Sequence, residues 1–160
     1  MNPTRESGLT QPACSGRAIV PAGEFAEQAP VSLYKMTQQY IVEGLKIEHR
    51  LLYVLSAYHG AQRNPSGQLF ISAAMDMCRN HSILLAGLMG KKPDDFSFPH
   101  IAEEPVFPAA AVSLYTQAAQ HFKKSSLDIP ENRVIQIFRW LSEVSVDLAG
   151  SLEMTGEQVK

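Results

Sequence analysis

Three side chains in this sequence have types and spacing that could support chemistry. Cys78 and His81 stand three residues apart, so a helix places them on one face, about one turn from each other. Glu48 comes earlier, between the apolar residues Leu45 and Leu52. A thiolate, an imidazole and a carboxylate can bind iron, zinc or copper, and the same groups can exchange protons. The sequence therefore offers a small metal-binding or proton-handling cluster.

The same three residues also have a structural interpretation. Glu48 and His81 can form a hydrogen bond or ion pair inside an apolar core, and Cys78 can pack as a small apolar side chain. We favour this structural polar cluster, without a bound metal, because ligand sets normally show more specific spacing than one Cys-x-x-His. The metal-binding alternative, with Glu48, Cys78 and His81 as ligands of Fe, Zn or Cu, stays open.

Two segments must position these residues, and both have the apolar periodicity of amphipathic helices. The first covers residues 33–58, and we expect Ser32 to be its N-cap. The second covers residues 69–89, with Asn64 as the cap before it and Gly90 as its left-handed stop. The short connection between the two segments predicts an antiparallel pair.

Two further helices are predicted at about residues 109–125 and 130–154, again with a short connection. The irregular segment 91–108 separates the two pairs. About 15 extended residues at about 3.3 Å each cover about 50 Å, which is enough to return along a whole helix. The segment would pack its aromatic residues on the way: Phe96, Phe98 and Phe107. The sequence predicts an all-α four-helix bundle over residues 31–157.

This order of elements resembles the ferritin-like arrangement in topology. The resemblance to its di-iron members implies a core Glu on each of two helices and a Glu-x-x-His on each of the others. Glu48 fits the first helix, but Cys78 replaces the expected Glu before His81. On the last helix, Glu143 and Asp147 fall on the solvated face. The complete di-metal signature is therefore missing, and only a reduced ligand set remains.

Composition narrows the classes of function. With 160 residues, 45% of them apolar, the chain suits one compact domain. The net charge of −2 gives no basic face for nucleic acid. No apolar run approaches the roughly 18 residues that a membrane span needs. The two cysteines do not form a disulfide framework and the N-terminal residues lack an apolar leader, so we expect a cytoplasmic protein.

Residues 1–30 are rich in Pro, Gly, Ser and Gln, and we expect a flexible N-terminal arm. The sequence shows no complete catalytic set, so we expect a non-enzymatic protein that acts through protein–protein association. An adaptor, a chaperone-like protein or a regulatory subunit would fit, with a protein partner or with a second copy as a homodimer. Two features favour such contacts: the wide apolar face flanked by Tyr34, Tyr53 and Tyr58, and the methionine-rich second helix.

Two alternatives remain to this function. The first is a ferritin-like metal-binding or redox protein with the reduced ligand set. The second is an enzyme or carrier that binds a small apolar ligand between the helices, and only the Met and aromatic lining supports it.

Overall fold

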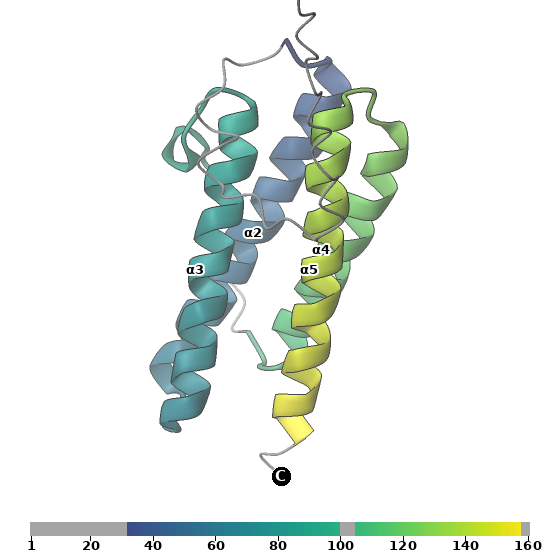
Figure 1. Ribbon diagram of the computed structural model, residues 1–160. Coiled ribbons are helices and arrows are strands. Elements are labelled where there is room, and N and C mark those ends of the chain that lie inside the picture. The colour runs from purple at the N-terminus through teal and green to yellow at the C-terminus, as the bar shows by residue number, and fades with distance from the viewer. Residues whose placement is uncertain (1–31, 100–104, 158–160) are drawn as a thin grey trace, which may run out of the picture.

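The computed structural model describes residues 32–99 and 105–157, with side chains placed as far as Met154. All regular structure in these residues is helical, which confirms the predicted all-α fold. It consists of α2 (Lys35–Ala61), α3 (Pro65–Leu88), the short 3₁₀ turn η1 (Pro93–Asp95), α4 (Ala109–Asp128) and α5 (Asn132–Glu157) (Figure 1). The predicted N-terminal arm lies outside the described residues.

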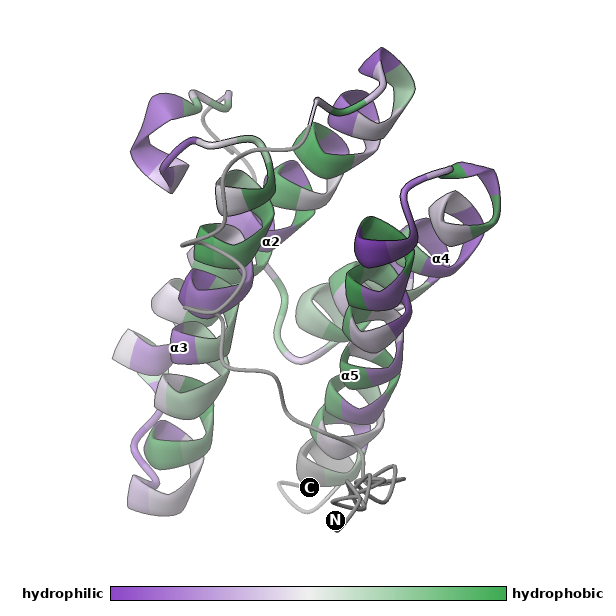
Figure 2. Cartoon of the chain, turned by 45° about the horizontal axis from the view of Figure 1, so that its top comes forward, coloured by the Kyte–Doolittle hydropathy of each residue, from purple (hydrophilic) through white to green (hydrophobic). Residues whose placement is uncertain are grey.

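The four helices form the predicted bundle of two antiparallel pairs, α2 with α3 and α4 with α5, and α2 also packs along α4. The connection after α3 returns to the opposite end of the bundle before α4 begins (Figure 1). Consequently α3 and α4 run in the same direction. By contrast, α3 and α5 hardly touch, and a view turned by 45° shows the two pairs separated along this side (Figure 2).

The start of α2 differs from the prediction. The helix begins at Lys35 with Tyr34 at the N-cap position, and that residue supplies no side-chain cap. Instead, the carboxylate of Glu131, just before α5, accepts hydrogen bonds from the Tyr34 N–H (2.9 Å) and the Thr37 hydroxyl (2.7 Å). The prediction of Ser32 as the N-cap was wrong, because a carboxylate distant in sequence takes over the role of a local cap.

The ends of the other helices follow the local signals in the sequence more closely. The side chain of Asn64 accepts a hydrogen bond from the Ser66 N–H (3.0 Å), and Pro65 occupies the first helical position of α3. Gly90 has a φ of 66°, in the left-handed region that stops a helix. These predictions are confirmed.

The long connection packs its aromatic side chains against the bundle, as predicted. Near one end, the ring of Phe98 lies 5.3 Å from that of His49 on α2, and Phe96 stacks parallel to Phe98. Near the other end, Phe107 stacks on Tyr58. Part of the wide apolar face of α2 is therefore covered by this chain itself.

Two buried clusters fill the bundle, one toward each end. The cluster at the end where α2 begins includes Ile41, Leu85, Phe122, Phe138 and Leu141. The cluster at the opposite end includes Leu51, Leu55, Ile71, Tyr115 and Leu152. No helix in the described part of the chain is both long enough and apolar enough to cross a membrane.

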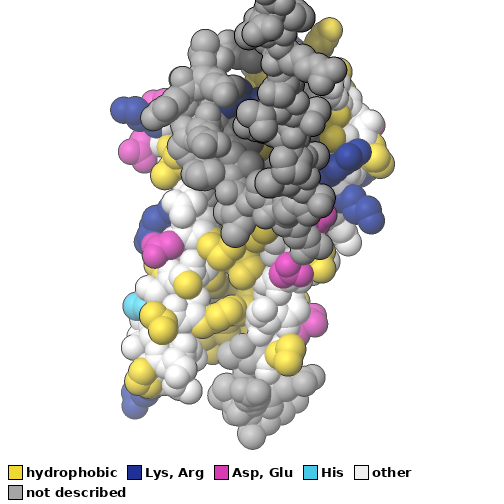
Figure 3. Space-filling model, viewed as in Figure 1, with side chains coloured by type: hydrophobic (Ala, Val, Ile, Leu, Met, Phe, Trp, Pro, Cys, Tyr) yellow, Lys and Arg dark blue, Asp and Glu magenta, His cyan; other side chains and the backbone are white. Residues whose placement is uncertain are grey.

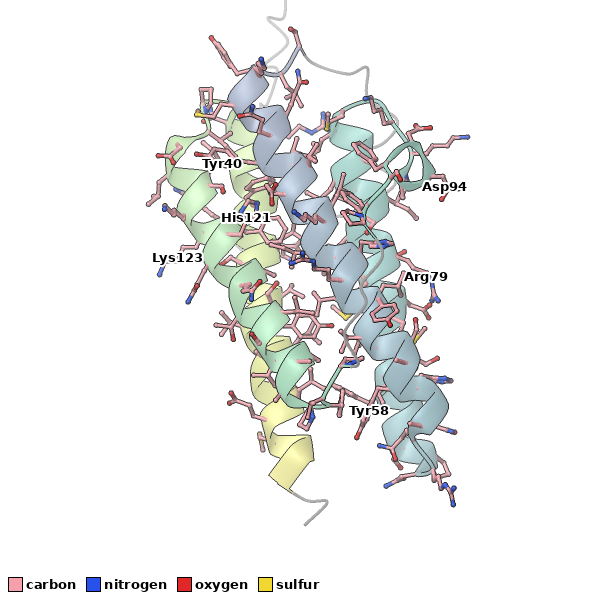
Figure 4. The ribbon with its side chains drawn as sticks, turned by 180° about the vertical axis from the view of Figure 1, so that it is seen from behind. Tyr40, Tyr58, Arg79, Asp94, His121 and Lys123 are labelled. Atoms are coloured by element: carbon pink, nitrogen blue, oxygen red, sulfur yellow. The ribbon has the colours of Figure 1, made fainter. Side chains whose placement is uncertain are left out.

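The helices α2 and α4 approach each other closely beside the first cluster. A Cβ added to Gly44 of α2 would lie 2.8 Å from Cε1 of Phe122, so only glycine fits there without a shift. His121, the residue before Phe122 in α4, donates its Nε2–H to the backbone carbonyl of Tyr40 at 2.9 Å. Figure 4 shows these two residues facing each other from α4 and α2.

Candidate functional site

Glu48 and His81 meet in the middle of the bundle, between the two apolar clusters. Only 1% of Glu48 and 3% of His81 is exposed. Oε1 of Glu48 lies 3.0 Å from Nδ1 of His81. A carboxylate only accepts hydrogen bonds, so with Glu48 ionised the Nδ1–H of His81 is the donor. The structure thus brings together the two residues that the sequence paired as a structural cluster.

The second oxygen of the Glu48 carboxylate is in a different situation. Oε2 is buried and has no hydrogen-bond partner among the described residues. A buried polar atom left without a partner costs about 1–3 kcal/mol. Only one oxygen of the Glu48 carboxylate is therefore satisfied, and the other bears an uncompensated desolvation cost.

Cys78 pairs with Tyr115 of α4. The Sγ of Cys78 lies 3.9 Å from the Tyr115 hydroxyl, and both side chains are buried. Burial, and after it the negative charge of Glu48, raises the pKa of the Cys78 thiol far above its ordinary value of 9.0. Burial is also the main cause that raises the pKa of Tyr115. Both groups are therefore neutral at physiological pH.

This arrangement does not assemble the ligands of a metal site. In residues 32–99 and 105–157, no group of three or more His, Cys, Asp or Glu side chains could hold a metal ion. A thiol held in its neutral form is a poor nucleophile, because the thiolate is the reactive species. Glu48, Cys78 and His81 are thus neighbours in the structure, and Cys78 contacts Tyr115.

On its other side, the ring of His81 meets Trp140 of α5. The two ring centroids lie 5.3 Å apart and the planes are nearly perpendicular, at 82°. Since α3 and α5 otherwise hardly touch, this edge-on contact marks the sides of the two helices that face each other.

Apolar side chains continue along both helices below this contact. Met77 lies one turn before His81 on α3, and Val144 lies one turn after Trp140 on α5. Because the helices are antiparallel, these two half-buried residues lie at the same level. We call this surface the α3–α5 recess and define it by Phe70, Met77, Trp140, Val144 and Leu148. Figure 3 shows hydrophobic side chains gathered between the two helices in the lower half of the view.

The rim of the recess is acidic on one side. From Trp140 to Glu157, helix α5 carries four acidic residues and neither Lys nor Arg. Figure 3 shows Asp and Glu side chains beside the recess on the α5 side. On α3, Asp76 and Arg79 form an exposed ion pair of 2.7 Å and offset each other. The exposed positions of Glu143 and Asp147 confirm that these acids do not face the core.

The recess is the main feature that sequence reasoning missed. Val144 and Leu148 belong to the apolar stripe of α5, and Met77 belongs to that of α3. A stripe shows that a side chain avoids water, but it does not tell whether a neighbouring helix covers it. The signal that was available is the width of the α5 stripe, which Trp140 extends beyond the core-facing residues.

Comparisons of this chain with models of protein families, with curated proteins and with solved structures found no match. The function is therefore argued from the geometry alone.

Proposed function

We propose that the protein acts, without catalysis, by binding another protein, and that the α3–α5 recess accepts an apolar segment of that partner with Lys or Arg beside it. The observation that supports this is the row of half-buried apolar residues Met77, Val144 and Leu148, which helical spacing places on a side of the bundle where α3 and α5 hardly touch. An adaptor, a chaperone-like protein or a regulatory subunit would each act through binding of this kind.

The physical properties of the recess fit such a partner. Burial of apolar surface contributes about 25 cal/mol per Å², so two or three large side chains supply several kcal/mol. Methionine adapts its shape to different partners, and Trp140 offers a large flat contact at low entropic cost. The acidic rim on α5 favours a basic flank and speeds its approach.

The buried polar residues play a supporting part in this proposal. The Glu48–His81 hydrogen bond fixes the His81 ring, and that ring packs edge-on against Trp140 at the recess. The Glu48–His81 pair thus helps to position Trp140, one of the residues that define the recess. Cys78 and Tyr115, neutral and buried, supply neither a nucleophile nor a charged ligand.

The test uses two valines on the same helix. Val144 lines the recess, whereas Val146 is 59% exposed on another face of α5. A photo-crosslinking side chain at position 144, with position 146 as the control, identifies the partner, which is then purified and titrated. We expect Val144→Glu to weaken binding at least tenfold, or about 1.4 kcal/mol, and Val146→Glu to leave it unchanged. Equal affinities for the two variants, both folded by circular dichroism, would contradict the proposal.

Mass in solution tests the homodimer as the partner. A dimer that dissociates in Val144→Glu but not in Val146→Glu would identify a second copy of this chain as the occupant of the recess. Elemental analysis tests the metal-binding or redox alternative. Stoichiometric iron, zinc or copper that is lost in His81→Ala would favour that alternative over a metal-free binding protein.

A further inference from the structure

We infer that residues 17–25 of this chain bind its own α3–α5 recess, so that the N-terminal segment competes with the partner. The inference rests on the proposed function and concerns the regulation of the same surface. Two observations support it: the reach of the chain before Ser32 and the apolar residues within that reach.

The chain before Ser32 starts at the correct end of the recess. The described residues begin beside the first turn of α2, at the end of the bundle where α5 also begins (Figure 1). A helix rises about 1.5 Å per residue, so Val144 and Leu148 lie about 18 and 24 Å from the first residue of α5. An extended chain covers about 3.3 Å per residue. Phe25, seven residues before Ser32, can therefore reach about 23 Å, which is the level of Val144 and Leu148.

The segment has suitable side chains at these distances. Ile19 and Val20 lie about 40 Å of extended chain from Ser32, enough to reach the far end of the recess. Pro21 favours an extended backbone at Val20, which suits a narrow surface between two helices. Phe25 and the Ile19–Val20 pair are the largest apolar groups in this part of the sequence.

The charges within the segment cancel, so its apolar contacts must supply the binding. Arg17 stands two residues before Ile19 and can pair with the acids of α5, but Glu24 stands next to Phe25, at the level of Glu143 and Asp147, where like charges repel. Weak apolar binding is enough because the segment is covalently attached, and a short linker holds it at an effective concentration in the millimolar range.

Trp140 gives a direct readout, because it is the single tryptophan of the chain and lies at the recess. In the full-length protein, we expect Ile19→Asp combined with Phe25→Asp to shift Trp140 emission to longer wavelength and to increase its quenching by acrylamide at least twofold. Leu9→Asp, in the same part of the chain but outside residues 17–25, is the matched control and should change neither quantity.

A second measurement places the segment on the recess. A photo-crosslinking side chain at position 25 of the full-length protein should form intramolecular cross-links to the peptides that contain Met77, Val144 or Leu148. Cross-links only to other peptides, or only between two molecules, would overturn the inference. So would an unchanged Trp140 in the Ile19→Asp/Phe25→Asp variant.

Partner titration separates this inference from the proposed function. Freed from competition, the Ile19→Asp/Phe25→Asp variant should bind the purified partner at least threefold more tightly than the parent chain. If the segment variant leaves Trp140 and partner affinity unchanged while Val144→Glu still weakens binding, the inference fails and the proposed function stands. If Trp140 responds and position 25 cross-links to the recess, but Val144→Glu binds the partner normally, the segment docks and the proposed function fails.

Discussion

The two oxygens of the Glu48 carboxylate have different roles. Oε1 holds the His81 ring in place, while Oε2 is buried without a partner among the described residues. Removing one member of such a pair leaves the other buried and unsatisfied, and this costs more than the hydrogen bond itself contributes. The two residues therefore act as a unit in the middle of the core.

This coupling gives the first prediction. We expect Glu48→Leu and His81→Leu each to lower the free energy of unfolding by about 2–4 kcal/mol, and the double variant to lose clearly less than the sum. Urea unfolding of the four proteins measures the coupling. Glu43→Leu, at an exposed position of the same helix, is the matched control and should change stability by less than about 0.5 kcal/mol. Single variants that are both harmless would show that the two residues are not partners.

Cys78 gives a prediction on pH. Its folded pKa is raised above the ordinary value of 9.0, so the unfolded thiol loses its proton first as the pH rises. The neutral Cys78 thiol makes its full contribution to the free energy of unfolding below pH 9. Above pH 9 this contribution falls by up to about 1.4 kcal/mol per pH unit. Unfolding measured from pH 8 to 10.5 should show a steeper decline for the parent than for Cys78→Ala. Cys14→Ala, which keeps the buried thiol, should follow the parent, and identical slopes for all three would contradict the assignment.

At the scale of the elements, the sequence predicted the helices well and their ends unevenly. Asn64 and Gly90 work through neighbouring backbone groups, so local sequence revealed them. The cap on α2 comes from Glu131, which is 97 residues from Tyr34, and no local pattern could indicate it. For the same reason the sequence suggested a link between Glu48 and His81, which periodicity places in the core, but not their neighbours Tyr115 and Trp140.

The close approach of α2 and α4 gives a prediction at this scale. Gly44→Ala would place its Cβ 2.8 Å from Phe122, a ring that is fully buried against Phe138. We expect a loss of about 1–3 kcal/mol in the free energy of unfolding, although alanine favours a helix by about 1 kcal/mol. Gly150→Ala in α5 is the control, since nothing lies within 4 Å of its added Cβ, and it should stabilise the protein slightly. Thermal and urea unfolding compare the two, and equal effects would contradict the argument.

At the scale of the whole molecule, the bundle is unevenly held together. Helix α4 packs against both α2 and α5, whereas α3 packs mainly against α2 and leaves the recess beside it. An α-helical topology and the long returning connection could be predicted from periodicity and chain length. This imbalance could not, since it depends on the distance between two helices that no pattern along the chain encodes.

The imbalance has a measurable consequence for local stability. We expect the central amides of α3 to exchange with solvent at least tenfold faster than those of α4, because fewer packed elements must separate to open them. Hydrogen exchange followed by mass spectrometry measures this, with α2, which packs against both α3 and α4, as the protected reference. Protection of α3 equal to that of α4 would show that the recess is closed in solution.

Three hydrogen bonds join the start of α2 to Asp128, the last residue of α4, and to Glu131, just before α5, and they also bear on how the chain folds during synthesis. They link residues 88 to 97 positions apart, so the partners of Tyr34, Thr37 and Tyr40 leave the ribosome only after α2 and α3 are complete. Until then the first hairpin exposes the face that α4 will cover, including the space beside Gly44. Closure of such a long loop is entropically costly and slow compared with hairpin formation. The nascent chain therefore passes through a stage in which half of its core is open to other molecules, and the Glu131 carboxylate marks the end of that stage.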